Sequence, residues 1–231
     1  MGNNLRGTLP WELALLTNME TIQVRLNELS GTIPTQYRRL SRLRTFEVAE
    51  NYMTGTIPCW MYGIKEPQDV DDDEANTSND DGCSDAKTLP FLRTLDLATN
   101  YFTGTLQADV QLYPGLNFIY LSGNALSGSI PDELFDIGID NDTIDDSLIE
   151  LTMMYNMLSG SIPTTIGNLR HLELFWIDEN FLIDGTIPTQ LGTLIEMKDL
   201  SISYCRLSGE FRFPSSCVRA PNDSSFFNVI T

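Results

Sequence analysis

The stretch LNFIYLSGNALSGSIP, residues 116–131, decides the fold because its pattern recurs along the whole chain. Its first half reads Leu-x-x-Leu-x-Leu-x-x-Asn, with Ile119 in the second leucine position, and its second half reads Asn-x-Leu-x-Gly-x-Ile-Pro. The asparagine position falls at residues 3, 27, 51, 100, 124, 156, 180 and, with cysteine in its place, 205. Most neighbours are 24 or 25 residues apart, whereas the spacings of 49 after Asn51 and 32 after Asn124 hold one repeat plus extra residues. This period predicts a solenoid of stacked coils.

Each position of the repeat has a structural reason. The alternation Leu95-x-Leu97 predicts a short strand with one buried face, and such strands stack in parallel from coil to coil. The asparagine amide can satisfy backbone groups of neighbouring coils that would otherwise be buried unpaired. The glycine permits a tight backbone path, and the proline begins a short helix or 3₁₀ turn. We therefore expect one buried row made by Leu95, Ile119, Leu151 and Phe175.

This period and the Leu-x-Gly-x-Ile-Pro ending closely resemble the plant-type class of leucine-rich repeats, over about residues 1–210 apart from two insertions. That class occurs in receptor-like kinase ectodomains, receptor-like proteins and polygalacturonase-inhibiting proteins. The resemblance implies an α/β solenoid, a right-handed superhelix with a parallel β-sheet on its concave face and short helices or 3₁₀ turns on its convex side. The resemblance is specific for the fold and leaves the ligand open, and we predict that the chain is not an enzyme because the sequence shows no catalytic constellation.

The repeat pattern also predicts the domain organisation. We expect about eight repeats over residues 1–210, and a C-terminal cap and tail over residues 211–231. Because Met1 comes just before an asparagine position, we expect the array to be N-terminally truncated. The extra residues form two acidic insertions, near residues 60–88 and 136–147.

Charge and composition exclude several kinds of partner. The net charge is −18 and the isoelectric point is near 4.2, which argues against nucleic-acid binding and against adsorption to anionic lipid headgroups. No run of about 18 apolar residues is present, so we expect no membrane insertion by this segment.

Four cysteines suggest two disulfide bonds. Cys59 and Cys83 flank most of the first insertion, and Cys205 and Cys217 bracket the point where the repeat pattern fades. Proximity favours the pairs Cys59–Cys83 and Cys205–Cys217 among the three pairings that four cysteines allow, and four free thiols are the alternative.

Three Asn-x-Ser/Thr sequons, at Asn76, Asn141 and Asn222, fall in the two insertions and the tail and avoid the repeat body. This placement favours N-glycosylation of a secreted chain. Together with the cysteines it predicts an extracellular or cell-surface location.

The strand residues that point outward predict the binding surface. Large side chains gather on the C-terminal half of the expected concave face, and two carboxylates flank them. The predicted ligand-binding residues are Phe118, Tyr120, Met154, Tyr155, Leu174, Trp176, Asp178, Glu179 and Tyr204. Exposed Trp and Tyr are typical interface anchors, and the acids favour a basic element on a protein or peptide partner. A glycan partner and a meaningless scatter of aromatic residues remain the alternatives.

The sequence gives little support for chemistry. Its single histidine, His171, is expected in a solvent-facing loop, and no catalytic group surrounds it. Asp69-x-Asp71-x-Asp73 resembles the start of a calcium loop, but Glu74 stands where that loop needs glycine. We therefore predict no catalytic residue, no metal and no cofactor.

Two other functions fit the same repeats. The chain could inhibit a secreted hydrolase, because its acidity suits a basic enzyme. It could also bind ice through stacked hydroxyl side chains that follow the motif glycine, at Thr8, Thr32, Thr56, Thr105, Ser129, Ser161 and Thr186. Recognition of a protein, peptide or glycan on the concave face is the leading prediction.

Overall fold

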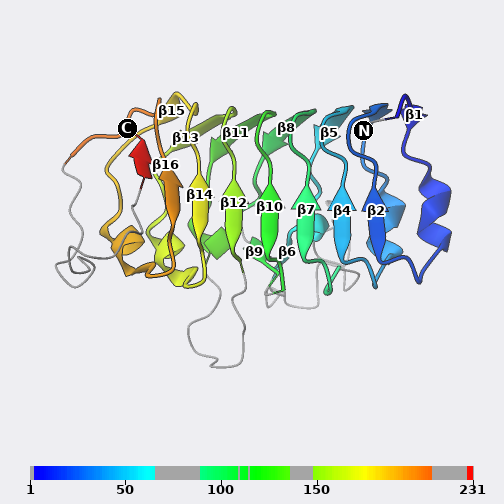
Figure 1. Ribbon diagram of the computed structural model, residues 1–231, viewed down its shortest axis with the longest axis horizontal. Helices are drawn as coiled ribbons and strands as arrows, with labels where there is room; N and C mark the ends of the chain where they lie inside the picture. The colour runs from blue at the N-terminus through cyan, green and yellow to red at the C-terminus, as the bar shows by residue number, and fades with distance from the viewer. Residues whose placement is uncertain are drawn as a thin grey trace, which may run out of the picture.

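The structure is a computed structural model that describes residues 3–65, 89–108, 110–113, 115–135, 148–209 and 228–230. Within these residues the chain winds into coils that stack side by side, and Figure 1 shows their strands in sequence order from right to left. Two parallel sheets run along the stack, one on each of two sides of every coil. The predicted leucine-rich-repeat solenoid is confirmed.

The larger sheet has eight strands and one strand per coil. They are β2 (Thr21–Gln23), β4 (Thr45–Glu47), β7 (Thr94–Asp96), β10 (Phe118–Tyr120), β12 (Glu150–Thr152), β14 (Leu174–Trp176), β16 (Asp199–Ser201) and β17 (Asn228–Ile230). Ile119 pairs with Leu95 on one side and Leu151 on the other, and Leu151 pairs with Phe175. All four residues are buried, so the predicted row of leucine positions is confirmed.

The second sheet has seven strands, which follow the asparagine position of each coil. They are β1 (Arg6–Thr8), β3 (Glu28–Gly31), β5 (Tyr52–Thr56), β8 (Tyr101–Thr105), β11 (Ala125–Ser129), β13 (Met157–Gly160) and β15 (Leu182–Ile183). Gly55 in this sheet has φ +85°, and a Cβ there would lie 2.7 Å from the Thr32 methyl of the preceding coil. The motif threonine therefore packs on the motif glycine of the next coil.

Short 3₁₀ helices complete the coils. They are η1 (Trp11–Leu15), η2 (Thr35–Arg39), η3 (Cys59–Met61), η4 (Asp132–Phe135), η5 (Thr164–Asn168) and η6 (Thr189–Thr193). Each follows a motif proline, which presets the φ angle for the turn. A two-stranded antiparallel sheet, β6 (Gly63–Lys65) with β9 (Val110–Leu112), lies between two neighbouring coils.

The two insertions leave the register of the larger sheet intact. Phe46 pairs directly with Leu95, although 49 residues separate them, and both are buried. Trp60 and Met61 are also buried, so the repeat body extends further into the first predicted insertion than the sequence pattern indicates. Residues 66–88 and 136–147 lie outside the described part of the chain.

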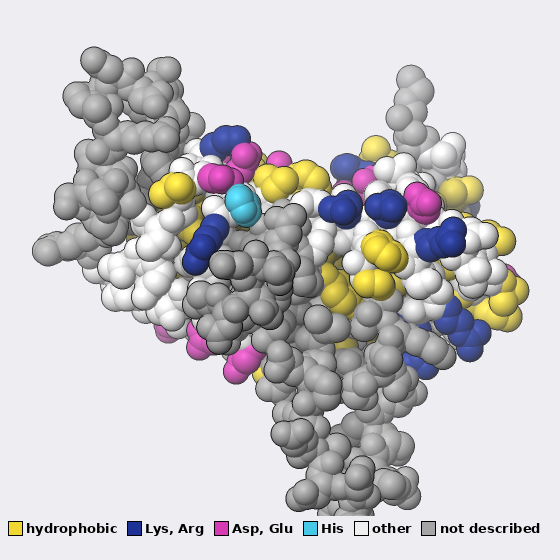
Figure 2. Space-filling model, turned by 90° about the horizontal axis from the view of Figure 1, so that it is seen from below, with side chains coloured by type: hydrophobic (Ala, Val, Ile, Leu, Met, Phe, Trp, Pro, Cys, Tyr) yellow, Lys and Arg dark blue, Asp and Glu magenta, His cyan; other side chains and the backbone are white. Residues whose placement is uncertain are grey.

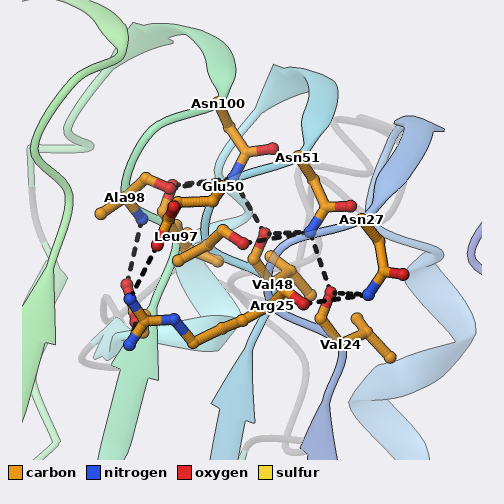
Figure 3. Close-up of polar contacts among 11 residues, drawn as sticks. Val24, Arg25, Asn27, Val48, Glu50, Asn51, Leu97, Ala98 and Asn100 are labelled. Atoms are coloured by element: carbon orange, nitrogen blue, oxygen red, sulfur yellow. Dashed lines mark hydrogen bonds and ion pairs between the residues drawn. The ribbon is translucent and has the colours of Figure 1, made fainter. Parts of the chain in front are cut away.

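A ladder of asparagines ties the coils together. The Nδ2 atom of Asn51 donates hydrogen bonds to the carbonyls of Val24 at 3.0 Å, Val48 at 2.9 Å and Ala49 at 3.1 Å. Its Oδ1 atom accepts one from the amide of Leu29 at 3.0 Å. Figure 3 shows the contacts that the Nδ2 atoms of neighbouring ladder asparagines make with backbone carbonyls. The asparagine thus satisfies backbone groups of its own coil and of the preceding one, as predicted.

One more strand is described near the C-terminal end, while most of the predicted cap lies outside the described residues. Strand β17 pairs in parallel with β16, with Val229 opposite Leu200, and so adds a strand to the larger sheet. Cys205 is a free thiol, and its Sγ donates to the carbonyl of Ile177 at 3.6 Å. The predicted Cys205–Cys217 disulfide is therefore not formed in this structure, because the thiol fills the ladder position that asparagine holds elsewhere. Cys217 itself lies outside the described residues.

Candidate functional site

The larger sheet and the turn after each of its strands present four columns of outward side chains, which we call the eight-strand face. Alternate residues of a strand point to opposite sides of a sheet, so one set lines the core and the other points away from it. Four members of the outward set are nevertheless buried by their neighbours: Ala49, Asp96, Thr152 and Ser203. The first column holds Thr21, Thr45, Thr94, Phe118, Glu150, Leu174 and Asp199, and the second holds Gln23, Glu47, Asp96, Tyr120, Thr152, Trp176 and Ser201. The third holds Arg25, Ala49, Ala98, Ser122, Met154, Asp178 and Ser203, and the fourth holds Leu26, Glu50, Thr99, Gly123, Tyr155, Glu179 and Tyr204.

Residues of the fourth column have a left-handed backbone. Apart from Gly123 they are not glycines, and their φ angles lie between 53° and 57°; the set is Leu26, Glu50, Thr99, Tyr155, Glu179 and Tyr204. Such a backbone is strained for a residue with a side chain. In the coils from β2 to β14, the backbone amide of the fourth-column residue donates a hydrogen bond to the third-column carbonyl of the next coil. One example runs from Tyr155 to Asp178 at 3.0 Å. These bonds hold the strained turn and fix where its side chain emerges.

In the N-terminal half of the face, built on β2, β4 and β7, one arginine serves two carboxylates. Arg25 Nη2 lies 3.0 Å from Glu50 Oε1, and Arg25 Nη1 lies 3.5 Å from Asp96 Oδ2 two coils away (Figure 3). The Asp96 side chain is only 7% exposed, and its Oδ1 also accepts the amide of Ala98 at 3.2 Å. This half therefore carries its own counter-ion.

Electrostatics in this cluster act in two directions. The hydrogen bond that Arg25 donates to Glu50 raises the pKa of Arg25, and the nearby Asp96 charge adds to the effect. Burial raises the pKa of Asp96, and this outweighs the opposing influence of the Ala98 amide and of Arg25. The guanidinium is thus stabilised in its charged form, whereas the buried carboxylate keeps a net desolvation cost.

In the C-terminal half, built on β10, β12, β14 and β16, the structure brings all nine predicted ligand-binding residues onto one face. The rings of Phe118 and Tyr120 stack with their centroids 6.3 Å apart. The Tyr120 hydroxyl donates to Glu150 at 2.6 Å, and burial followed by Glu150 raises the pKa of this phenol. Leu174, Trp176, Met154, Asp178 and Glu179 are partly buried.

The most exposed members of this half are two tyrosines of the fourth column. Tyr155 is 56% exposed and Tyr204 is 69% exposed. Aromatic side chains this open to water are costly to leave uncovered and favour an interface.

Three polar atoms of the C-terminal half are shielded from solvent without a hydrogen-bond partner. They are Ser122 Oγ, Trp176 Nε1 and Asp178 Oδ1, all in the second and third columns. An unsatisfied buried polar group costs about 1–3 kcal/mol, so natural structures avoid it outside functional sites. They lie within three successive coils, and the chain itself already encloses them.

The face as a whole is acidic. Among its described residues it carries a single cation, Arg25, against the carboxylates Glu47, Glu50, Asp96, Glu150, Asp178, Glu179 and Asp199. Cations lie instead on the lower edge of the solenoid, where Figure 2 shows exposed Lys and Arg side chains and the chain's single histidine. That histidine, His171, is exposed as predicted, with Nδ1 3.1 Å from Glu196.

The remaining predicted sites lie elsewhere. Cys59 is disulfide-bonded, while its predicted partner Cys83 lies outside the described residues. The sequons at Asn76, Asn141 and Asn222 are also outside them. The described part of the chain holds no group of three or more metal-ligating side chains and no helix long and apolar enough to cross a membrane.

The hydroxyl column predicted as an ice-binding alternative lies on the seven-stranded sheet, away from this face. There the methyls of Thr8, Thr32, Thr56, Thr105 and Thr186 pack on the glycines of the following coils, which gives those threonines a packing role.

Two features of the site were not found from the sequence. The Arg25–Glu50–Asp96 cluster spans three coils, and no local pattern indicates that the arginine reaches past its neighbour. The left-handed fourth column carries Leu, Glu, Thr and Tyr, whose own preferences argue against that conformation, and only Gly123 hints at it.

Comparison with known proteins supports the same architecture. The family description Leucine Rich Repeat matches residues 115–137 and 147–169. The LRR receptor-like serine/threonine-protein kinase GSO2 of Arabidopsis thaliana is 42% identical over 85 residues, which cover 36% of this chain and 6% of that protein.

Solved structures extend the likeness over nearly the whole chain. The ectodomain of the Arabidopsis thaliana receptor kinase GASSHO1/SCHENGEN3, in complex with CASPARIAN STRIP INTEGRITY FACTOR 2, gives a TM-score of 0.73 at 27% identity and covers 91% of this chain and 21% of that one. The ectodomain of the Arabidopsis receptor kinase HAESA, in complex with an extended IDA peptide hormone ligand, gives a TM-score of 0.62 at 24% identity, with 98% and 36% covered.

The chain thus spans about a fifth of the first of these ectodomains and a much smaller part of the GSO2 kinase. It has the leucine-rich-repeat solenoid fold, and its repeats are similar to those of plant receptor kinase ectodomains.

Proposed function

We propose that this chain is an extracellular or cell-surface recognition module that binds a basic protein or peptide on the C-terminal half of its eight-strand face. The observation that carries the proposal is the excess of negative charge in this half, beside aromatic side chains. Among its described residues it presents four carboxylates and no cation, namely Glu150, Asp178, Glu179 and Asp199, beside the exposed rings of Tyr155 and Tyr204 and the partly buried Trp176. Complementary charge guides a partner to such a surface, and aromatic anchors supply most of the affinity.

The relatives support a binding role rather than catalysis. The GASSHO1/SCHENGEN3 ectodomain was solved with a bound factor and the HAESA ectodomain with a peptide hormone. A repeat array that carries a regular column of outward residues from coil to coil suits an extended ligand, because each coil can contact successive ligand residues.

A display library of 15-residue peptides tests the proposal. Peptides enriched on the intact chain are expected to carry net positive charge. Trp176→Ala should weaken their binding about thirtyfold, because loss of a central aromatic anchor costs about 2 kcal/mol. Titration calorimetry measures the affinities, and thermal unfolding checks that the melting temperature of the variant is nearly unchanged.

Trp11→Ala is the matched control, because Trp11 is 49% exposed on η1 and lies off the eight-strand face. Enrichment of acidic peptides, or equal loss of binding in both tryptophan variants, would contradict the proposal.

A further inference from the structure

Glu179 stands between two exposed tyrosines. Tyr155 occupies the same fourth-column position one coil before it, and Tyr204 one coil after it. The amide of Tyr155 donates to the carbonyl of Asp178 at 3.0 Å, and the amide of Glu179 donates to the carbonyl of Ser203 at 3.0 Å. Because neighbouring strands lie about 4.8 Å apart, the two tyrosines are immediate neighbours of the carboxylate.

The acids at this point have no cation of their own. Neither Asp178 nor Glu179 forms an ion pair with any residue that the structure describes. Asp178 Oδ1 is shielded from water and unpartnered, as is Nε1 of Trp176 two residues earlier. A charged group held in this way is stabilised by an added cation more than an exposed carboxylate would be.

The N-terminal half of the same face shows what such acids bind. There the guanidinium of Arg25 lies against Glu50 at 3.0 Å and Asp96 at 3.5 Å, which are carboxylates from two different coils. The C-terminal half offers two carboxylates from one coil, Asp178 and Glu179. Tyrosines flank Glu179 in the fourth column, where Leu26 and Thr99 flank Glu50.

We infer that Asp178 and Glu179 bind the guanidinium of an arginine side chain on the partner, with the rings of Tyr155 and Tyr204 against its planar faces. The inference rests on the proposed function and identifies one contact within it. Arginine fits better than lysine because its planar group can stack on aromatic rings and donate two parallel hydrogen bonds to a carboxylate at once. Aromatic rings around a cation add a further attraction.

A titration with N-acetyl-arginine N-methylamide tests this contact, with the citrulline analogue as the uncharged isostere. Two-dimensional NMR follows the indole signal of Trp176, identified by its loss in Trp176→Phe, and the backbone amides of Tyr155, Glu179 and Tyr204. The arginine probe should shift these signals saturably, and the citrulline probe should bind at least tenfold more weakly. Equal binding of the two probes, or no saturable shift, overturns the inference.

Matched double variants separate a defined contact from general attraction to an acidic protein. Asp178→Asn with Glu179→Gln should weaken the arginine probe at least tenfold. Glu47→Gln with Glu133→Gln removes the same net charge outside the C-terminal half of the face and should change its affinity less than twofold. Equal weakening in both variants shows that only net charge matters and overturns the inference.

The two proposals fail in different ways. If enriched peptides bind and depend on Trp176, but replacing their arginines with citrulline leaves affinity unchanged, the arginine contact is wrong and the recognition function stands. If no peptide is enriched, the proposed function itself fails.

Discussion

The two halves of the eight-strand face share one backbone and differ in what they offer to a partner. Both rest on the same asparagine ladder and the same left-handed turns. In the N-terminal half, Arg25 neutralises Glu50 and Asp96, and the third column carries small alanines. In the C-terminal half, carboxylates lack a counter-ion and aromatic side chains stand exposed. The repeat therefore determines the backbone and the asparagine ladder, whereas a few outward residues determine whether the charges of a surface are already paired or are available to a partner.

The largest expected effect comes from the asparagine ladder that both halves share. Asn51→Ala and Asn180→Ala should each lower the free energy of unfolding by about 3 kcal/mol, because each removes four buried hydrogen bonds and leaves backbone groups unpaired. Urea unfolding followed by circular dichroism measures both values. A difference of more than about 1.5 kcal/mol between them would mean that the two halves do not share an equivalent frame.

The counter-ion of the N-terminal half should have a smaller effect on stability. Arg25→Ala leaves the buried Asp96 without its cation, and we expect a loss of about 1 kcal/mol, reduced because the Arg25 side chain is 50% exposed. Arg6→Ala, which breaks an exposed pair with Glu28 on the seven-stranded sheet, is the control and should cost less than about 0.5 kcal/mol. Equal costs would remove the special role of Arg25.

Extending the ladder past the C-terminal half should stabilise the chain slightly. Cys205→Asn restores the amide that every other described coil places here, and we expect a gain of about 0.5 kcal/mol in unfolding free energy. Cys205→Ser keeps a single donor and should show no gain. A loss of stability in the asparagine variant would show that the last coil departs from the frame of the others.

The smallest expected effect is a pH dependence that belongs to the N-terminal half. Burial raises the pKa of Asp96, so the folded state holds its proton at a higher pH than the unfolded state does. The contribution of Asp96 to stability should therefore fall as pH rises through its raised pKa. Asp96→Asn should remove that slope in unfolding experiments at a series of pH values. A slope unchanged in the variant would assign the effect to other carboxylates.

The sequence predicted the buried leucine row and the asparagine ladder because both recur at a fixed spacing. A leucine, an asparagine or a glycine at a fixed spacing has the same neighbours in every coil, so Ile119 and Asn124 could be placed from one repeat alone. The nine candidate binding residues followed from the same alternation. Contacts that skip a coil, such as Arg25 with Asp96, have no period and could not be predicted. The thiol of Cys205 was assigned to a disulfide because the sequence shows proximity to Cys217 but not that position 205 turns inward.

The continuous pairing across both long spacings has a consequence for how this surface can change. Residues 66–88 and 136–147 each stand in sequence between two strands that still pair in register, Phe46 with Leu95 and Ile119 with Leu151. The chain between two such strands can therefore gain or lose residues without displacing any outward column. The number of residues in these connections and the identity of the outward side chains can therefore change independently during evolution.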